Sequence, residues 1–479
     1  MHHGSHPVRP AAAAARVLAA VILAGGCAAA RGPAGPACIS FPPLRFTPPE
    51  VERVVLDCGA PLYLLRDTRL PLFSFHAMAR AGSAYDPKGK EGLAALAAEV
   101  MRTGGTLRMD PDELDRRIEF MGAELAVDAD QDAASLSLSC LSRDTAEALG
   151  IALDVLLRPA FSPAKLDLRK EQVREAIRRW NDEPGQAVSR EFRRLVYGDH
   201  PYAHPVIGEP GSMDAIGRGD LLEFHRARFN PSGMIFGAAG DFDRGALVAG
   251  LNAAFGAAKP YLPPPLPPPA GNAGGGRAIF LVRKGTQQAH IAAGHIGIRR
   301  ADPDFIPVMI MNEILGGGVF SSRLLERIRS AEGLAYSAGS QFTPALQAGL
   351  FRASCQTKES TAAEALGIMI EEMERMRAGL VAEEEISRAR DSYVNSFVFN
   401  FTNPSQAVGQ MMGVEFMGLP RDYLKTYLAK VAAVTRGDVL RAAREHLHPD
   451  TATIVVLGEG ADLSAALRRF GPVRPVTPK

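Results

Sequence analysis

The chain has 479 residues, more than one ordinary hydrophobic core accommodates, so its length predicts two or more domains. Hydrophobic residues make up 46% and charged residues 22%, which is ordinary for a soluble globular protein. The formal net charge is only +1, and this balance argues against a nucleic-acid-binding protein.

Residues 1–27 are typical of a secretory signal peptide, because basic residues ending at Arg9 precede an apolar stretch at 11–23 and small residues follow it. The apolar stretch is too short to span a bilayer comfortably. Small residues before Cys27 also resemble a bacterial lipobox, in which Cys27 would become the lipidated first residue. Plain cleavage near residues 28–30 is the alternative. We therefore expect a protein of the Gram-negative periplasm, either free or attached to the membrane as a lipoprotein.

The remaining cysteines, Cys38, Cys58, Cys140 and Cys355, are widely spaced and form no C-x-x-C pair, so their spacing does not predict a metal site. Cys38 and Cys58 could pair in an oxidising compartment, or both could be separate small hydrophobic residues. No later segment offers eighteen consecutive apolar residues, so we expect no membrane-spanning helix in the mature protein.

Alternating and continuous apolar patterns predict the elements of the first half in chain order. Strands are expected at 51–56, 62–65, 73–81 and 133–141, helices at 145–157 and 163–180, and a closing strand at 234–239.

A Pro- and Gly-rich stretch at 259–276 predicts a linker, stiff where proline dominates and flexible at its glycine-rich end. It separates a predicted N-terminal domain, 45–258, from a predicted C-terminal domain, 277–470. The segments on its two sides resemble each other: Ala146-Glu147-Ala148-Leu149-Gly150-Ile151 recurs as Ala363-Glu364-Ala365-Leu366-Gly367-Ile368, an offset of 217 residues (363 − 146). A duplicated domain of about two hundred residues follows from this repeat.

Strands and helices do not alternate strictly in either half, which predicts the α+β class. We expect two homologous α/β-sandwich domains, each a mainly antiparallel sheet with helices on one face.

Several short motifs mark the chain, including Gly82-Ser83-Ala84-Tyr85-Asp86-Pro87, Gly92-Leu93-Ala94 and Gly333-Leu334-Ala335-Tyr336. Together with the duplication, they resemble the pitrilysin/insulinase family of zinc metallopeptidases over the mature chain from about residue 50. The resemblance implies that the two domains form one half of a clamshell.

Active members of that family carry His-x-x-Glu-His on the helix after the Gly-Leu-Ala turn, because residues four apart share a helix face and can bind one zinc ion. Here the corresponding positions hold Ala95, Ala98 and Glu99, and the position of the third ligand holds Ala176. We expect Ala95, Ala98 and Glu99 to lie on the helix side away from the core, with Glu99 as a solvated carboxylate. The chain is therefore expected to bind no metal or other cofactor.

The resemblance implies substrate-binding roles for Arg329 and Tyr336, which match an arginine and a tyrosine that active relatives use. Some bacterial relatives divide the work between two chains, so we expect a zinc-bearing homologous partner and a peptide substrate. Without the resemblance, Arg329 is a solvated helix residue and Tyr336 a packed aromatic ring. The competing hypotheses are a non-enzymatic periplasmic peptide-binding or scaffold protein, and a single-chain zinc peptidase with displaced ligands.

Histidines elsewhere could form a different metal site, so their spacing matters. His200 and His204 are four residues apart but lie across two prolines, and His446 and His448 are two apart near a strand. Neither pair has a third partner at motif spacing, so we expect no zinc at either.

Overall fold

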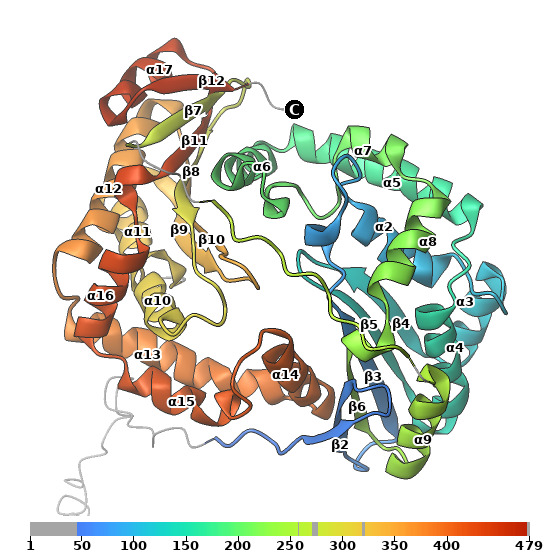
Figure 1. Ribbon diagram of the computed structural model, residues 1–479. Helices are drawn as coiled ribbons and strands as arrows, with labels where there is room; N and C mark the ends of the chain where they lie inside the picture. The colour runs from blue at the N-terminus through green and yellow to red at the C-terminus, as the bar shows by residue number, and fades with distance from the viewer. Residues whose placement is uncertain (1–45, 257, 271–275, 319–320, 477–479) are drawn as a thin grey trace, which may run out of the picture. The chain divides into compact units, whose positions relative to one another are not determined.

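The computed structural model describes residues 46–476, apart from 257, 271–275 and 319–320. The predicted signal peptide, Cys27 and Cys38 lie outside the described residues, so lipidation and the Cys38–Cys58 pairing stay predictions. Two six-stranded sheets form the framework (Figure 1). Among the described residues, no helix is both long enough and apolar enough to cross a membrane.

The first sheet has the strand order β1-β2-β6-β3-β5-β4. All neighbouring strands are antiparallel except β2 and β6, which are parallel. The predicted strands are all present, with ends within two residues of the expected ones. The strands are β1 (Glu52–Val55), β2 (Pro61–Arg66), β3 (Leu72–Ala79), β4 (Glu124–Ala129), β5 (Ala134–Leu141) and β6 (Ile235–Gly240).

The second sheet has the strand order β12-β7-β11-β8-β10-β9, with β7 parallel to both β11 and β12 and the other pairs antiparallel. Its order β7-β11-β8-β10-β9 repeats β2-β6-β3-β5-β4 of the first sheet, so the duplication predicted from the sequence is present in the topology. The strands are β7 (Ala278–Val282), β8 (Ala289–Ile296), β9 (Ala335–Thr343), β10 (Leu350–Thr357), β11 (Thr453–Leu457) and β12 (Val473–Val476).

Each sheet packs one face against helices of its own half, as expected for an α+β sandwich. In the first half these helices surround a core that contains Phe73, Phe75, Leu136 and Leu138 of the sheet. The helices are α2 (Leu93–Thr103), α3 (Pro111–Phe120), α4 (Thr145–Leu157), α5 (Pro163–Asp182), α7 (Pro210–Ala215), α8 (Arg218–Arg228) and α9 (Arg244–Phe255). One more helix of this half, α6 (Pro184–Tyr197), contributes no residue to this core.

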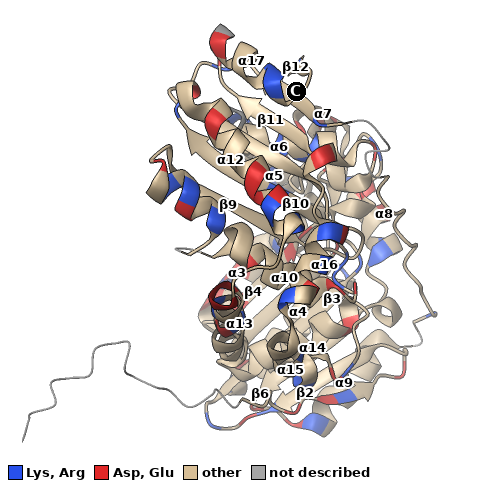
Figure 2. Ribbon diagram, turned by 90° about the vertical axis from the view of Figure 1, so that its left-hand side faces the viewer, with Lys and Arg blue, Asp and Glu red and all other residues tan. Residues whose placement is uncertain are grey.

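The second half repeats this arrangement around its own core, and α12 follows β10 just as α4 follows β5. The helices are α10 (Phe305–Asn312), α11 (Arg323–Leu325), α12 (Ala362–Ala378), α13 (Glu383–Phe397), α15 (Tyr423–Ala433), α16 (Arg436–His446) and α17 (Ala461–Leu467). One more helix of this half, α14 (Pro404–Phe416), contributes no residue to this core. Lysine and arginine are interspersed with aspartate and glutamate along the chain, as Figure 2 shows.

The opposite face of each sheet is covered by a helix from the other half. Val188 and Phe192 of α6 pack against the second sheet, and Val408 and Met412 of α14 pack against the first (Figure 1). The two helices begin alike, with Pro184-Gly185-Gln186-Ala187-Val188 in α6 and Pro404-Ser405-Gln406-Ala407-Val408 in α14. The halves therefore exchange one helix each, an arrangement that the sequence analysis did not anticipate.

Candidate functional site

Helix α2, which carries the positions corresponding to the zinc motif, begins at a tight turn. Gly92 precedes it at φ +98°, a conformation that favours glycine, and an added Cβ would come within 2.7 Å of the Ile207 carbonyl oxygen. Asp86 accepts hydrogen bonds from the backbone N–H groups of Gly92 and Ala94, both at 2.7 Å. Burial raises the pKa of Asp86 to about 7. The local sequence thus fixes where α2 starts.

One expectation for α2 is wrong, because Ala98 is fully buried in the core rather than on an outward face. Ala95 is half-buried and is not among the buried residues of that core. Ala98 is buried because α2 packs against β4 as well as α5 and α8, which leaves little of the helix surface to solvent. The alanine at 98 is thus a packing residue of the core.

Glu99 is not a free solvated carboxylate either, because it forms an ion pair with Arg169 of α5. The two side chains are 35% and 33% exposed. Ala176 lies two helical turns beyond Arg169 on the same side of α5, and it is half-buried. Zinc in a peptidase needs three protein ligands, whereas these four positions offer one carboxylate, which is already paired with a guanidinium. The residues present do not fit a zinc ion.

The nearby acidic residues of α5 do not replace the missing ligand. Glu171 and Glu175 are exposed, and each pairs with an arginine three residues along the same helix, Arg174 at 2.5 Å and Arg178 at 3.3 Å. Both are therefore surface charges.

A different cluster, Asp302, Asp304 and His446, brings potential metal ligands within 4.8 Å of one another. Sequence analysis missed it because Asp304 and His446 are far apart in the chain. Arg441 donates to both oxygens of Asp304 at 2.6 and 2.7 Å, and His446 lies 2.8 Å from one of them. Arg441, aided by His446, holds the pKa of Asp304 at about 2. Since Arg441 occupies the carboxylate, the cluster is an ion-pair network between the residue that precedes α10 and helix α16.

His200 is likewise occupied by structural hydrogen bonds. One ring nitrogen accepts from the backbone N–H of Tyr202 at 3.1 Å, and the other lies 2.8 Å from the carbonyl oxygen of Pro267 in the linker. His204 contacts the carbonyl oxygen of Pro205 at 3.1 Å. The structure gives these histidines no shared ligand set.

Arg329 and Tyr336 do lie together. The guanidinium carbon of Arg329 is 4.8 Å from the centre of the Tyr336 ring, within the range of a cation–π interaction. Tyr336 is 83% exposed, so the alternative expectation of a packed aromatic ring is wrong. A surface pair of this kind is available to a ligand.

The local backbone explains why Tyr336 projects outward. Gly333, at φ +63°, turns the chain from a π-helix at Glu326–Ala331 into β9. Ala335 is opposite Thr357 and Ser337 is opposite Gln356, so Tyr336 is the extra residue of a β-bulge. Bulges redirect a side chain relative to the regular alternation of a strand.

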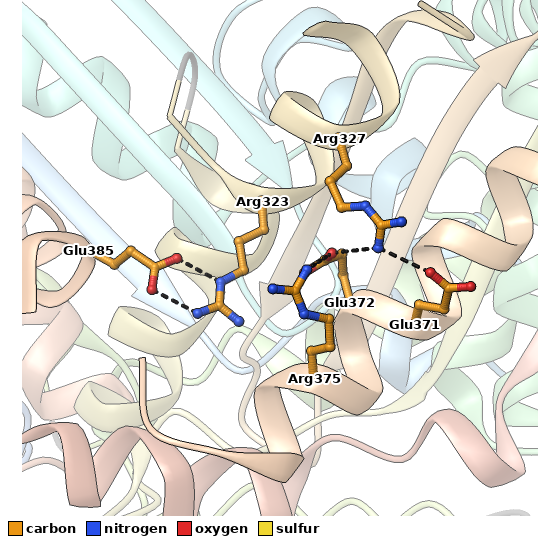
Figure 3. A network of polar contacts seen from close by, with 6 residues as sticks. All are labelled: Arg323, Arg327, Glu371, Glu372, Arg375 and Glu385. Carbon is orange, nitrogen blue, oxygen red and sulfur yellow. Dashed lines mark hydrogen bonds and ion pairs between the residues drawn. The ribbon is translucent and has the colours of Figure 1, made fainter. Parts of the chain in front are cut away.

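Ion pairs hold the segment that carries Arg329, as Figure 3 shows. Arg323 donates to both oxygens of Glu385 at 2.6 and 2.7 Å. Arg327 reaches the fully buried Glu372 at 2.8 Å, and Arg375 donates to the same carboxylate at 2.7 Å. Arg329, two residues after Arg327, is exposed and forms no ion pair with any described residue.

Two family models match successive segments of the chain. The model described as Insulinase (Peptidase family M16) matches residues 77–209, and the model described as Peptidase M16 inactive domain matches residues 215–393. The altered zinc positions lie in the first match, and Arg329 and Tyr336 lie in the second.

Some relatives of the chain are named as peptidases and others as non-peptidases. An uncharacterized zinc protease of Streptomyces coelicolor is 27% identical, covering 72% of this chain and 76% of its own length. A Helicobacter pylori protein named non-peptidase homolog YmxG is 22% identical, covering 81% of this chain and 89% of its own. The solved peptidase M16 inactive domain from Pseudomonas fluorescens is 26% identical with a TM-score of 0.79, covering 86% of this chain and 98% of that chain. From these matches and the altered zinc positions, the chain belongs to the insulinase peptidase family M16, as a catalytically incomplete member.

Proposed function

We propose that this chain is one subunit of a two-chain M16 peptidase, in which a homologous partner carries the zinc ion. The observation that carries the proposal is the exposed pair Arg329 and Tyr336, held by an ion-paired segment in a chain whose zinc positions offer no usable ligand set. An exposed aromatic ring and an unpaired guanidinium contribute little to the chain's own stability, so their placement favours a binding role.

In this proposal the chain binds and orients an extended peptide. Strand β9 is the last strand of the second sheet, so one of its edges can accept a further strand through backbone hydrogen bonds. The hydroxyl group of Tyr336 and the N–H groups of Arg329 are donors for a peptide carbonyl oxygen that gains negative charge during hydrolysis. The hydrolytic chemistry itself would come from the partner.

We also propose that the protein acts outside the cytoplasm, in the periplasm. The support is the signal-like sequence of residues 1–27, with Cys27 as a candidate lipidation site. A membrane-attached position would bring it to exported peptide substrates.

The test is to purify the chain with and without a candidate partner that has an intact His-x-x-Glu-His motif, and to measure peptide cleavage by each chain alone and by both together. We expect cleavage only when the two chains are together. Arg329→Ala and Tyr336→Phe should each lower kcat/KM of the two-chain complex at least tenfold. Arg116→Ala and Phe120→Ala, at exposed positions on α3, are the matched controls and should leave it unchanged. Full activity in both site variants would contradict the substrate-binding role.

A non-enzymatic peptide-binding or scaffold protein is the second candidate, favoured by the name of the Helicobacter pylori relative, non-peptidase homolog YmxG. In that case the two chains would form a complex without gaining peptidase activity. The same assay distinguishes the candidates, because a stable complex that cleaves no peptide supports the scaffold and opposes the subunit role.

A further inference from the structure

Two cavities lie at corresponding places in the two halves. Each lies between the start of the helix that the other half contributes and the sheet face that this helix covers. The first, of about 690 Å³, is lined by residues of β3, β4 and β5 and by the start of α14. The second, of about 430 Å³, is lined by residues of β8, β9 and β10 and by the start of α6. The duplication therefore produced a pair of related cavities.

The two cavities differ in charge. The first contains the acidic residues Asp67 and Glu124, and its arginine, Arg69, is paired with Asp67. None of the residues that line the second is acidic, and one of them is Arg352 of β10. At the repeat offset of 217 residues, the corresponding residue of β5 is Ser135. Both cavities therefore contain an arginine, but only in the second is it without an acidic residue in the lining.

Arg352 lacks a counterion among the described residues. It is half-buried, and its one hydrogen bond there runs to the hydroxyl group of Ser189 on α6, at 2.7 Å. Arg193, one turn further along α6, adds positive charge, because its own hydrogen bonds go to the uncharged side chain of Gln131 and the carbonyl oxygen of Tyr202. Burial, together with Arg193, lowers the pKa of Arg352. A guanidinium desolvated without a partner is costly and gains from binding an anion.

The rest of the cavity supplies neutral hydrogen-bonding groups. Ser337 of β9 and Ser354 and Gln356 of β10 line it, together with the imidazole of His290 on β8. A guanidinium has five N–H donors, and Ser189 accepts from one of them, so donors remain for a two-oxygen contact.

We propose that the cavity between α6 and the second sheet binds an oxyanion, a carboxylate or phosphate group of a small ligand, with Arg352 as its principal contact. Hydroxyl groups of Ser337 and Ser354 complete the site. Tyr336 does not line this cavity, and the proposal does not depend on the peptidase-subunit role.

Isothermal titration calorimetry on the purified full chain tests the proposal with two probes, inorganic phosphate and succinate, each compared with sodium chloride at the same ionic strength. Saturable binding of at least one probe is expected. Arg352→Gln should weaken it at least tenfold, whereas Arg116→Gln, at an exposed position of α3, should leave it within twofold. Phosphate-only or succinate-only binding identifies the ligand class, and equal binding indicates a general oxyanion site.

A second variant keeps the test decisive if Arg352→Gln does not fold. Ser354 is flanked across the sheet by Ala292 and Gly339, so Ser354→Leu would fill the cavity and leave the charge in place. It should also weaken binding at least tenfold. The proposal is overturned if neither probe binds, or if the folded variants of Arg352 and Ser354 bind as well as the wild type.

Discussion

At the scale of single residues, the arginines of segment 323–336 make different kinds of contact. Arg323 and Arg327 reach carboxylates of α13 and α12, and Glu372 at the centre of this network is fully buried. Arg329 instead lies over the exposed Tyr336 ring. The buried ion pairs fix the backbone, and the surface pair remains accessible to other molecules.

Glu372 and Glu371 provide a matched test, because both accept a hydrogen bond from Arg327 but are 0% and 59% exposed. Glu372→Ala should lower the free energy of unfolding by about 3 kcal/mol, since it leaves two guanidinium groups without their buried partner. Glu371→Ala should cost under about 1 kcal/mol. Urea unfolding followed by circular dichroism measures the free energy of unfolding of both variants. Equal losses would contradict the stabilising role of the buried Glu372 ion pairs.

Asp304 should make stability depend on pH in the acidic range. Its pKa is about 2 in the folded protein, held there by Arg441, and about 3.9 in an unfolded chain. The ionised carboxylate therefore stabilises the fold above pH 4, and this contribution disappears as the pH falls towards 2. Between pH 5 and 2 the wild type should lose about 2 kcal/mol more than Asp304→Asn. Glu445→Gln, which alters an exposed partner of Arg441, should retain the wild-type pH profile.

At the scale of elements, much of the fold followed from the sequence and some of it did not. The helix at 145–157 and its repeat were predictable because local pattern and duplication agree. The burial of Ala98 and the Glu99–Arg169 pair were not, since they depend on which helices surround α2. The exchange of α6 and α14 also escaped prediction, because an apolar helix face does not specify which sheet it covers. Their similar first turns were the available sequence signal.

The close packing of α14 on the first sheet can be tested at Gly237 of β6. A Cβ atom there would overlap Val408 and Met412 of α14. Gly237→Ala should therefore lower the free energy of unfolding by about 2 kcal/mol. Val408→Ala, which makes room, should offset at least about 1 kcal/mol of that loss in the double variant. Gly250→Ala on α9, where a Cβ atom meets nothing within 4 Å, is the control and should not destabilise. Additive losses would show that α14 does not pack as described.

At the scale of the whole molecule, several contacts besides the exchanged helices join the halves. Asp132, in the β4–β5 turn, accepts from the Tyr202 hydroxyl at 2.5 Å and from the backbone N–H of Leu346 at 3.0 Å. In addition, Gln347 donates to the Leu266 carbonyl oxygen in the linker at 3.1 Å. The covalent linker is therefore not the main connection between the halves.

A cut in the linker tests this conclusion. A protease site introduced between Pro264 and Pro265, both exposed, should allow cleavage without separating the fragments. We expect both fragments to co-elute in size-exclusion chromatography under native conditions and to separate in denaturant. Separation in native buffer would contradict the exchange of α6 and α14.

The central claim is that Ala95, Ala98, Glu99 and Ala176 leave this chain without a zinc site, and its most direct test is the metal content of the purified chain. Inductively coupled plasma mass spectrometry after incubation with zinc and gel filtration should find far less than one zinc ion per chain. A preparation with one zinc ion per chain, retained when Glu99→Gln is introduced, would show that displaced ligands elsewhere hold the metal and would contradict the account.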